Sequence, residues 1–197
     1  MIGQKITGVI LAGGKNSRMG TDKGLLEVEG RRIIDRIISS LQPEVDQIII
    51  ISNGDNYEYL GYEVYSDIVK DCGPMGGIYT ALSMSPSEKN IILSCDMPFI
   101  TKEAIQYILE DSDDCDIVIP ECYGNFEPLC AMYAKTCRNT FHQLLARGEW
   151  KLKDALKYFQ IKKVECNDLL NADIVFSNIN TRKEYQNITE NIYEHNN

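Results

Sequence analysis

The stretch Val9-Ile-Leu-Ala-Gly-Gly-Lys-Asn-Ser-Arg-Met-Gly-Thr-Asp-Lys23 runs from an apolar segment directly into a loop that holds three glycines and three cations. The apolar residues before the loop are typical of a buried strand. Adjacent glycines allow backbone N–H groups to approach a ligand closely, and cationic side chains neutralise phosphate oxygens. The stretch therefore predicts an anion-binding loop at the end of a strand, and a solvated basic turn is the alternative.

Strand and helix patterns alternate along most of the chain. The expected strands are 6–12, 47–52, one ending near Tyr65, 90–95, 116–120, 127–133 and 161–165. The expected helices are 32–41, 77–84, one after Thr101, 136–147 and 151–158. Such alternation predicts an α/β protein with a Rossmann-like three-layer α/β/α sandwich and a mostly parallel sheet.

Length and composition limit the class of protein. The 197 residues, 44% of them hydrophobic, fit one domain of the larger sort. No apolar run approaches the roughly 18 residues of a membrane helix, and the apolar start is too short for a secretory signal. The seven cysteines form no CxxC pair and are expected to be reduced thiols. We therefore expect a cytoplasmic protein that does not act at a membrane.

The charge distribution favours a small anionic ligand. The net charge of −9 argues against nucleic-acid binding, which needs a basic surface. Lys15, Arg18 and Lys23 nevertheless lie close together in the sequence, with Asp22 as the single acid among them. The loop is thus a locally positive segment of an acidic chain.

Two common phosphate-binding motifs do not fit the loop. A P-loop needs four residues between its glycines, but five separate Gly14 from Gly20, and Thr21 stands where Lys is required. The dinucleotide motif GxGxxG also fails, because Gly13 and Gly14 are adjacent. What the sequence predicts is a long glycine-rich loop at the carboxyl edge of a parallel sheet, where open α/β sheets bind their ligands.

Residues 11–26, LAGGKNSRMGTDKGLL, resemble the pattern LAGGxSxRMGxDKxLL of nucleotidyltransferases with a GT-A-like fold, specifically the molybdenum cofactor guanylyltransferases. Asn16 stands where Ser is usual. Further matches follow in chain order at Tyr65-Ser-Asp67, Gly73-Pro-Met-Gly-Gly77, Ser94-Cys-Asp-Met-Pro98, Glu127-Pro-Leu-Cys130 and Ser177-Asn-Ile-Asn-Thr181. The resemblance covers almost the whole chain.

This resemblance implies transfer of GMP from GTP to the phosphate of molybdopterin, with Mg²⁺ as cofactor and pyrophosphate as by-product. It implies a single domain over 1–197, with a nucleotide-binding half at about 1–100 and an acceptor-binding half at about 101–197. GTP and molybdopterin would be the substrates, with transient contacts to molybdoenzymes or their chaperones. Two alternatives stay open. The first is a related transferase that uses another nucleotide, such as CMP, or another phosphorylated acceptor. The second is a nucleotide-binding protein without catalytic activity. Other relatives carry LAAG where this chain has LAGG at residues 11–14, and this difference favours GTP over CTP as the nucleotide.

On the nucleotide side, the resemblance implies that GTP is bound by Leu11, Ala12, Gly13, Gly14, Lys23, Asn53, Asp67 and Asp96. Backbone groups at the start of the loop would read the purine edge, and Asn53 would lie near the ribose or base. Asp67 considered alone is equally well a turn residue. The glycines of residues 73–77 suit a tight turn that brings a helix N-terminus, which favours anions, to the site.

Asp96 is the expected metal ligand. It follows a buried strand, and Mg²⁺ commonly takes one or two protein carboxylates together with phosphate and water. The alternative is a helix cap, for which Thr101 is the better candidate. Cys95 is the one cysteine that lies beside an acidic motif, but no neighbouring cation pattern supports a role as nucleophile, so packing in the interior is favoured.

The acceptor side offers Asn178 and Asn180, which would hydrogen-bond the second substrate or else act as turn residues that cap a final helix. Residues 127–129 and the cations Arg147 and Lys151 are the other candidates for this wall.

Catalysis is expected to depend on Arg18, Lys23 and Asp96, which would position the reactants and screen their charges. The two histidines, His142 and His195, lie in no motif.

Overall fold

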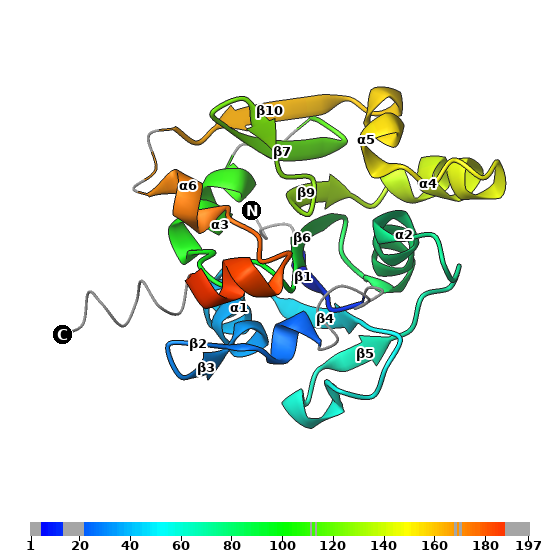
Figure 1. Ribbon diagram of the computed structural model, residues 1–197. Helices are drawn as coiled ribbons and strands as arrows, with labels where there is room; N and C mark the ends of the chain where they lie inside the picture. Colours follow the sequence, from blue (N-terminus) through cyan, green and yellow to red (C-terminus); the bar gives the residue numbers. More distant parts are fainter. Residues whose placement is uncertain are drawn as a thin grey trace.

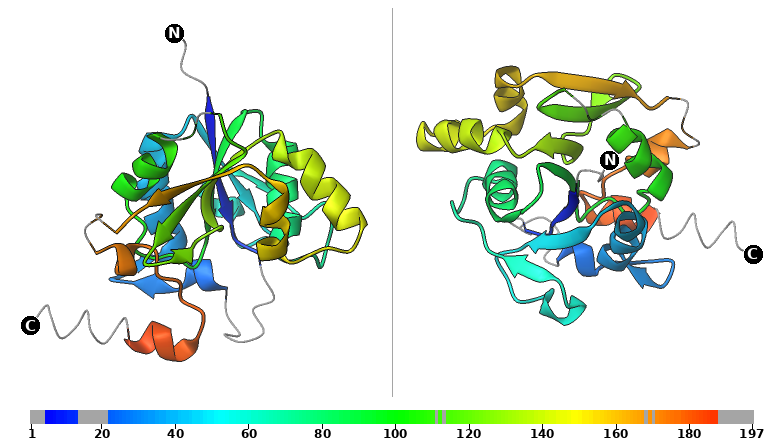
Figure 2. Two further views of the ribbon diagram at one scale, coloured as in Figure 1. Left: turned by 90° about the horizontal axis from the view of Figure 1, so that it is seen from above. Right: turned by 180° about the vertical axis from the view of Figure 1, so that it is seen from behind.

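The structure, a computed structural model, describes residues 5–13, 22–110, 112, 114–167, 169 and 171–187. One large sheet forms the middle of the molecule, and helices cover both of its faces (Figures 1 and 2). Its strands are β1 (Ile6–Leu11), β4 (Gln47–Ile51), β5 (Glu63–Tyr65), β6 (Lys89–Ser94), β7 (Ile117–Cys122), β8 (Asn125–Phe126), β9 (Cys130–Ala134) and β10 (Ile161–Glu165). A separate ribbon consists of β2 (Glu27–Val28) and β3 (Arg31–Arg32).

The helices are mostly short. The α-helices are α1 (Ile33–Leu41), α2 (Pro74–Met84), α3 (Lys102–Glu110), α4 (Cys137–Ala146), α5 (Leu152–Ala155) and α6 (Ala172–Val175), with another at 182–187. The 3₁₀ helices are η1 (Lys23–Leu25), η2 (Gln42–Glu44), η3 (Glu58–Leu60) and η4 (Leu156–Tyr158).

The strands of the main sheet run in the order β10-β7-β9-β6-β1-β4-β5, with β8 paired to β7. Pairing is parallel between β1 and β4, β1 and β6, β4 and β5, and β7 and β10. Only β9 on this path runs against its neighbours β6 and β7. The carboxyl ends of the parallel strands and the start of β9 therefore meet at one edge of the sheet, which is where the candidate site lies.

Two hydrophobic layers lie on opposite faces of the sheet. Side chains alternate along a strand, so Ile10 of β1 packs with α1 and α3, while Val9 and Leu11 pack with α2 and α4. β4 behaves in the same way, with Ile48 and Ile50 on the first face. Apolar residues on both faces explain why these strands are uninterrupted apolar runs. The mostly parallel three-layer α/β fold expected from the sequence is confirmed.

Several element boundaries differ from the prediction. The helix expected at 77–84 begins at Pro74, because proline is well tolerated at the first helical position. The strand expected at 127–133 begins only at Cys130, since the Cys130 N–H closes a turn onto the Glu127 carbonyl at 2.9 Å. Thr101 caps α3 as expected, with its Oγ1 accepting from the Ala104 N–H at 3.2 Å.

The expectation that all seven cysteines are reduced thiols is wrong for two of them. Cys122 at the end of β7 and Cys166 after β10 form a disulfide, with their Cα atoms 5.2 Å apart. The register pairs Glu121 with Glu165, which places the next residue of each strand side by side. Strand pairing over 44 residues of sequence brings these two together, and no local pattern reveals it. The other five cysteines are not part of a disulfide.

Among the residues that the structure describes, no helix is long and apolar enough to cross a bilayer.

Candidate active site

The ends of β1 and β6 bring the two strongest sequence motifs together. Their register pairs Leu11 with Ser94, and the Cys95 N–H donates to the Leu11 carbonyl at 3.1 Å. Asp96 therefore lies directly beside the point where the glycine-rich loop leaves the sheet. Leu11, Gly13 and Asp96 line one cavity of about 710 Å³.

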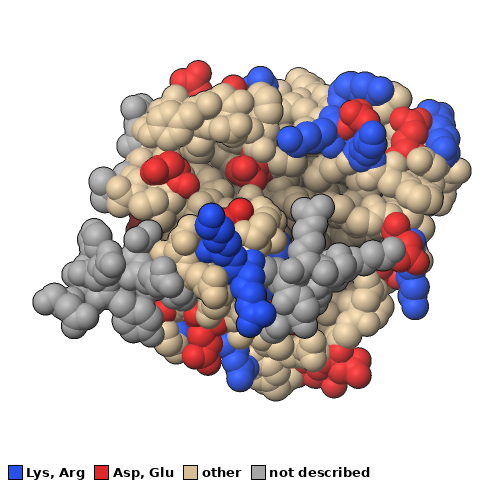
Figure 3. Space-filling model, viewed as in Figure 1, with Lys and Arg blue, Asp and Glu red and all other residues tan. Residues whose placement is uncertain are grey.

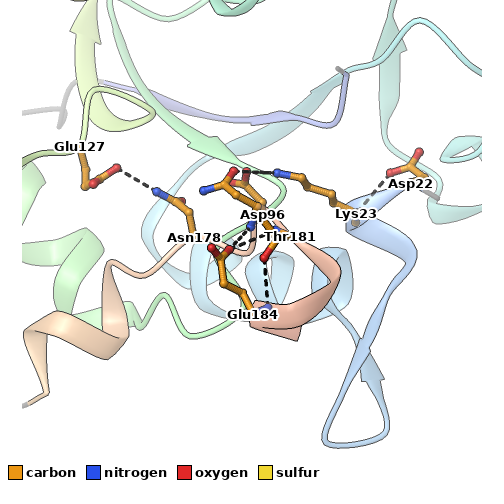
Figure 4. A network of polar contacts seen from close by, with 9 residues as sticks. Asp22, Lys23, Asp96, Glu127, Asn178, Thr181 and Glu184 are labelled. Atoms are coloured by element: carbon orange, nitrogen blue, oxygen red, sulfur yellow. Dashed lines mark hydrogen bonds and ion pairs between the residues drawn. The ribbon is translucent and has the colours of Figure 1, made fainter. Parts of the chain in front are cut away.

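Lys23 connects the two motifs through its ammonium group (Figure 4). Its Nζ donates to Asp96 Oδ2 at 2.9 Å and to Asn180 Oδ1 at 3.0 Å. The two charged side chains are only 21% and 15% exposed, so water screens this ion pair less than an open surface pair. Three segments far apart in the sequence thus place a cation between two oxygen ligands.

Lys23 is positioned by the preceding residue, Asp22, whose contacts no sequence pattern indicates. Asp22 caps η1, with its Oδ1 accepting from the Gly24 N–H at 3.2 Å and from the Tyr57 hydroxyl, and its Oδ2 accepting from Asn56 at 3.3 Å. Tyr57 is fully buried, and burial, the neighbouring Cys95 and the bond to Asp22 raise its pKa. The Tyr57 phenol therefore remains a neutral donor that fixes the Asp22 carboxylate.

Cys95 packs in the interior. Burial, with a smaller effect of the Asp96 charge, raises the pKa of its thiol to about 12. A thiol with so high a pKa is protonated near neutral pH and is a poor nucleophile. His142 stacks on Tyr79 of α2 and is not among the residues that line the cavity, and His195 lies outside the described residues.

The nucleotide side of the cavity contains a fixed pair of polar residues. Asn53 Nδ2 donates to Asp67 Oδ2 at 2.8 Å, and the Asp67 N–H donates back to Asn53 Oδ1 at 3.0 Å. Asp67 Oδ1 is buried, and none of the described residues donates a hydrogen bond to it. Buried polar atoms are nearly always paired, so an orphaned carboxylate oxygen in a cavity indicates a place for a ligand donor such as a hydroxyl.

The first turn of α2 supplies another wall of the cavity. Gly73, Pro74 and Gly77 line it, and Gly73 has a positive φ of 58° that glycine adopts without strain. The N-terminus of α2, an 11-residue helix, therefore faces the same cavity and favours negative charge there.

Part of the backbone expected to read the base is engaged within the sheet. The Ala12 N–H donates to the Ile51 carbonyl at 2.9 Å, and the Leu11 carbonyl already accepts from Cys95. The sheet ladder therefore continues one residue past β1 and uses the Ala12 N–H, and base recognition by the backbone of Leu11, Ala12 and Gly13 stays a prediction. Gly13 lies beyond the ladder and borders the cavity, whereas Gly14 and Arg18 lie outside the described residues.

On the other side of Asp96 lies a second carboxylate, that of Glu127, which belongs to the segment 127–129 expected to form part of the acceptor wall. Glu127 is partly buried, and its Oε2 accepts from Asn178 Nδ2 at 3.1 Å (Figure 4). Burial and the Asp96 charge raise the pKa of Glu127, while Asn178 and Lys153 oppose the rise. The Glu127-Pro-Leu-Cys motif indicated the acceptor wall, but the contact between Glu127 and Asn178 could not be predicted from the sequence.

The late asparagines do not cap the final helix. Thr181 is the cap: its Oγ1 accepts from the Glu184 N–H, and Glu184 Oε2 accepts from the N–H groups of Asn180 and Thr181. The Ile179 N–H donates to the Asp96 carbonyl at 2.9 Å and holds this segment against the site. Asn178 and Asn180 therefore point to Glu127 and Lys23 respectively.

Comparison with known proteins identifies the family. Residues 8–163 match the model of the MobA-like NTP transferase domain. The chain belongs to the MobA-like NTP transferases.

Individual relatives of this transferase span nearly its full length. A "Probable molybdenum cofactor guanylyltransferase" of Clostridium perfringens is 36% identical over 190 residues, covering 93% of this chain and 96% of the relative. A "Molybdenum cofactor guanylyltransferase" of Desulfosudis oleivorans is 30% identical, with coverage of 92% and 93%. The molybdopterin-guanine dinucleotide biosynthesis protein A of Archaeoglobus fulgidus shares the fold, with a TM-score of 0.80, 23% identity and coverage of 95% and 99%.

The site of this MobA-like NTP transferase offers side-chain oxygens of the kind that bind a divalent metal. The oxygens of Asp96 and Asn180 already converge on the Lys23 ammonium, and hard oxygen ligands are what Mg²⁺ prefers. Within the described part of the chain, no group of three or more His, Cys, Asp and Glu side chains is placed to hold a metal. A metal here would therefore take most of its ligands from phosphates and water, as Mg²⁺ often does.

Cations of the acceptor half gather over α5 and the nearby end of α4, among several acids (Figure 3). Lys153 of α5 is the one that acts on the Glu127 carboxylate, where it lowers the pKa. Arg147 and Lys151, the cations expected from the sequence, are both exposed, and their role stays a prediction.

Proposed function

We propose that this MobA-like NTP transferase transfers GMP from GTP to the phosphate of molybdopterin and releases pyrophosphate. The supporting observation is the Lys23–Asp96 pair, which lies where the cavity with the orphaned Asp67 oxygen meets the Glu127–Asn178 pair. Two binding regions that share one charged centre suit transfer between two substrates. The names of the relatives supply the identity of those substrates.

The nucleotide would occupy the 710 Å³ cavity. Gly13 and the adjoining Gly14 would approach the base, Asp67 Oδ1 would accept from a ribose hydroxyl, and Asn53 would hold Asp67 in place. The N-terminus of α2 would favour the negative charge of the triphosphate. Arg18, in the same loop, would add a second cation to that of Lys23.

The chemistry requires charge control more than acid–base catalysis. A phosphate acceptor is already an anion, so it can attack the α-phosphorus of GTP in line without a general base. Lys23 would exchange its bond to Asp96 for a phosphate oxygen, while Asn178 and Asn180 would orient the acceptor. Asp96 would hold Mg²⁺, which when bound supplies positive charge for the phosphates and the departing pyrophosphate.

The test is pyrophosphate release by the purified protein with Mg²⁺, molybdopterin and GTP, CTP or ATP in turn. The proposal expects release with GTP that depends on molybdopterin and stops when the metal is removed with EDTA. Release with CTP alone would contradict the choice of nucleotide. No release with any nucleotide would indicate a protein that binds nucleotides without catalysis.

Two wider expectations belong to this proposal. The nucleotide half would end near residue 100 and the acceptor half would follow it, within one domain over 1–197. Transient contact with molybdoenzymes or their chaperones, which would receive the product in the cytoplasm, stays a prediction.

A further inference from the structure

Glu127 is held rigidly at the edge of the sheet where the site lies. Its N–H donates to the Pro120 carbonyl at 3.3 Å, and its carbonyl accepts from the Cys130 N–H at 2.9 Å. Because β9 runs against its neighbours, residues just before it lie at the same edge as Asp96. These bonds fix the main chain of Glu127 beside the site, and the bond from Asn178 orients its carboxylate.

The Glu127 carboxylate has capacity for a ligand. Within the described residues, a single hydrogen bond reaches it, from Asn178 to Oε2. An ionised carboxylate has two oxygens and about four acceptor positions. A partly buried carboxylate that is left short of donors is unfavourable, so this group is suited to receive N–H donors from a bound molecule.

The position of Glu127 indicates which molecule this would be. It lies across Asp96 from Lys23 and Asp22 (Figure 4), and it is not among the residues that line the nucleotide cavity. A negative side chain next to Asp96 repels phosphate, so the phosphate of the acceptor would not bind at Glu127. The fitting part of an acceptor is an uncharged ring edge that carries hydrogen-bond donors.

We propose that Glu127 determines acceptor specificity by binding a 2-amino-4-oxopyrimidine edge of the acceptor ring, with Asn178 orienting the carboxylate. This inference deepens the proposed function and depends on it. The exocyclic amino group and the neighbouring ring N–H of such an edge point the same way and match two carboxylate oxygens. Pterins and guanine share this edge, and Glu127 is assigned to the acceptor pterin because it lies outside the nucleotide cavity.

The test is steady-state kinetics of Glu127→Gln with molybdopterin, GTP and Mg²⁺, each varied in turn. Glutamine keeps the shape but replaces one acceptor oxygen with a donor, so it opposes one N–H of the ring edge. The expected result is a KM for molybdopterin at least about tenfold higher, with kcat and the KM for GTP unchanged. Glu127→Asp, which keeps the charge, should recover part of the loss.

Glu121→Gln is the matched control. Glu121 lies on the neighbouring strand β7, and it pairs with Lys163 at 3.5 Å. The same substitution there should leave both KM values unchanged, and thermal unfolding of both variants should show that they are folded.

Three results would overturn the inference. An increased KM for GTP would mean that Glu127 reads guanine, and an altered Mg²⁺ requirement with an unchanged acceptor KM would make it a metal ligand. Unchanged kinetics would mean that it binds no substrate. Inactive wild-type protein would instead contradict the proposed function itself, so the two failures are distinguishable.

Discussion

The nucleotide side and the acceptor side of this site are built in different ways. The nucleotide side consists of strand ends and the first turn of α2, and its central pair, Asn53 and Asp67, lies 14 residues apart in the sequence. The acceptor side depends on Glu127 and Asn178, which are 51 residues apart and come from the turn before β9 and the segment after α6. The nucleotide side is thus built from elements that are close in the sequence. The acceptor side forms only when distant segments of the chain pack together.

The two sides meet at Asp96, and the largest effect is expected there. Asp96→Ala removes the carboxylate that pairs with Lys23 and would hold the metal. Turnover should fall about a hundredfold or more, which is typical for loss of a preorganised electrostatic group at a reacting centre. Pyrophosphate release measures it, with Asp173→Ala in the exposed part of α6 as the control. If Asp96→Ala kept the turnover of the wild-type protein, Asp96 would not be the catalytic centre that the two sides share.

The anchor of Lys23 can be broken from within the fold. A Cβ on Gly24 would lie 2.5 Å from the Tyr57 hydroxyl oxygen, so Gly24→Ala should displace the donor that fixes Asp22. Overpacking of this kind costs about 1–3 kcal/mol of the free energy of unfolding, which urea denaturation measures. Gly54→Ala, where nothing lies within 4 Å, is the matched control. Equal stability of the two variants would contradict this packing argument.

The charge of Lys23 should matter somewhat less than the Asp96 carboxylate, since Arg18 is proposed to supply a second cation. Lys23→Ala is expected to lower kcat about tenfold, the effect of about 1.4 kcal/mol in the barrier. Lys102→Ala, which removes a cation paired with Glu44 at 3.5 Å, is the control. If Lys23→Ala changes only the KM for GTP, Lys23 binds substrate without stabilising the transition state.

Asp67→Asn sharpens the contrast between the two sides. The substitution replaces one carboxylate oxygen, Oδ1 or Oδ2, with an amide nitrogen. The KM for GTP should rise about fivefold, because one accepted hydrogen bond is worth about 1 kcal/mol. The KM for molybdopterin should stay the same, the reverse of the result expected for Glu127→Gln. A change in both KM values would show that the two sides are not independent.

The sequence predicted features that depend on neighbouring residues and missed contacts between segments that are distant in the chain. The apolar runs, the glycine-rich loop and the Asp96 motif are local, so they predicted the central strands and the edge of the sheet where the site lies. Boundaries at Pro74 and Cys130 were misplaced by about three residues, because a turn hydrogen bond and a permitted proline decided them. The Asp22–Tyr57 contact and the Cys122–Cys166 disulfide were missed, since no spacing rule connects residues that meet only through packing.

By itself, the sequence determined the α/β order of the elements, the family motifs and the residue types available to bind phosphate. These are local properties, because strand and helix preferences depend on side chains a few residues apart. Only the tertiary structure decided that Lys23 lies between Asp96 and Asn180, that the Ala12 N–H is used by the sheet, and that Glu127 faces Asn178. The reason is physical: those contacts depend on strand order and register, which the whole buried core selects together.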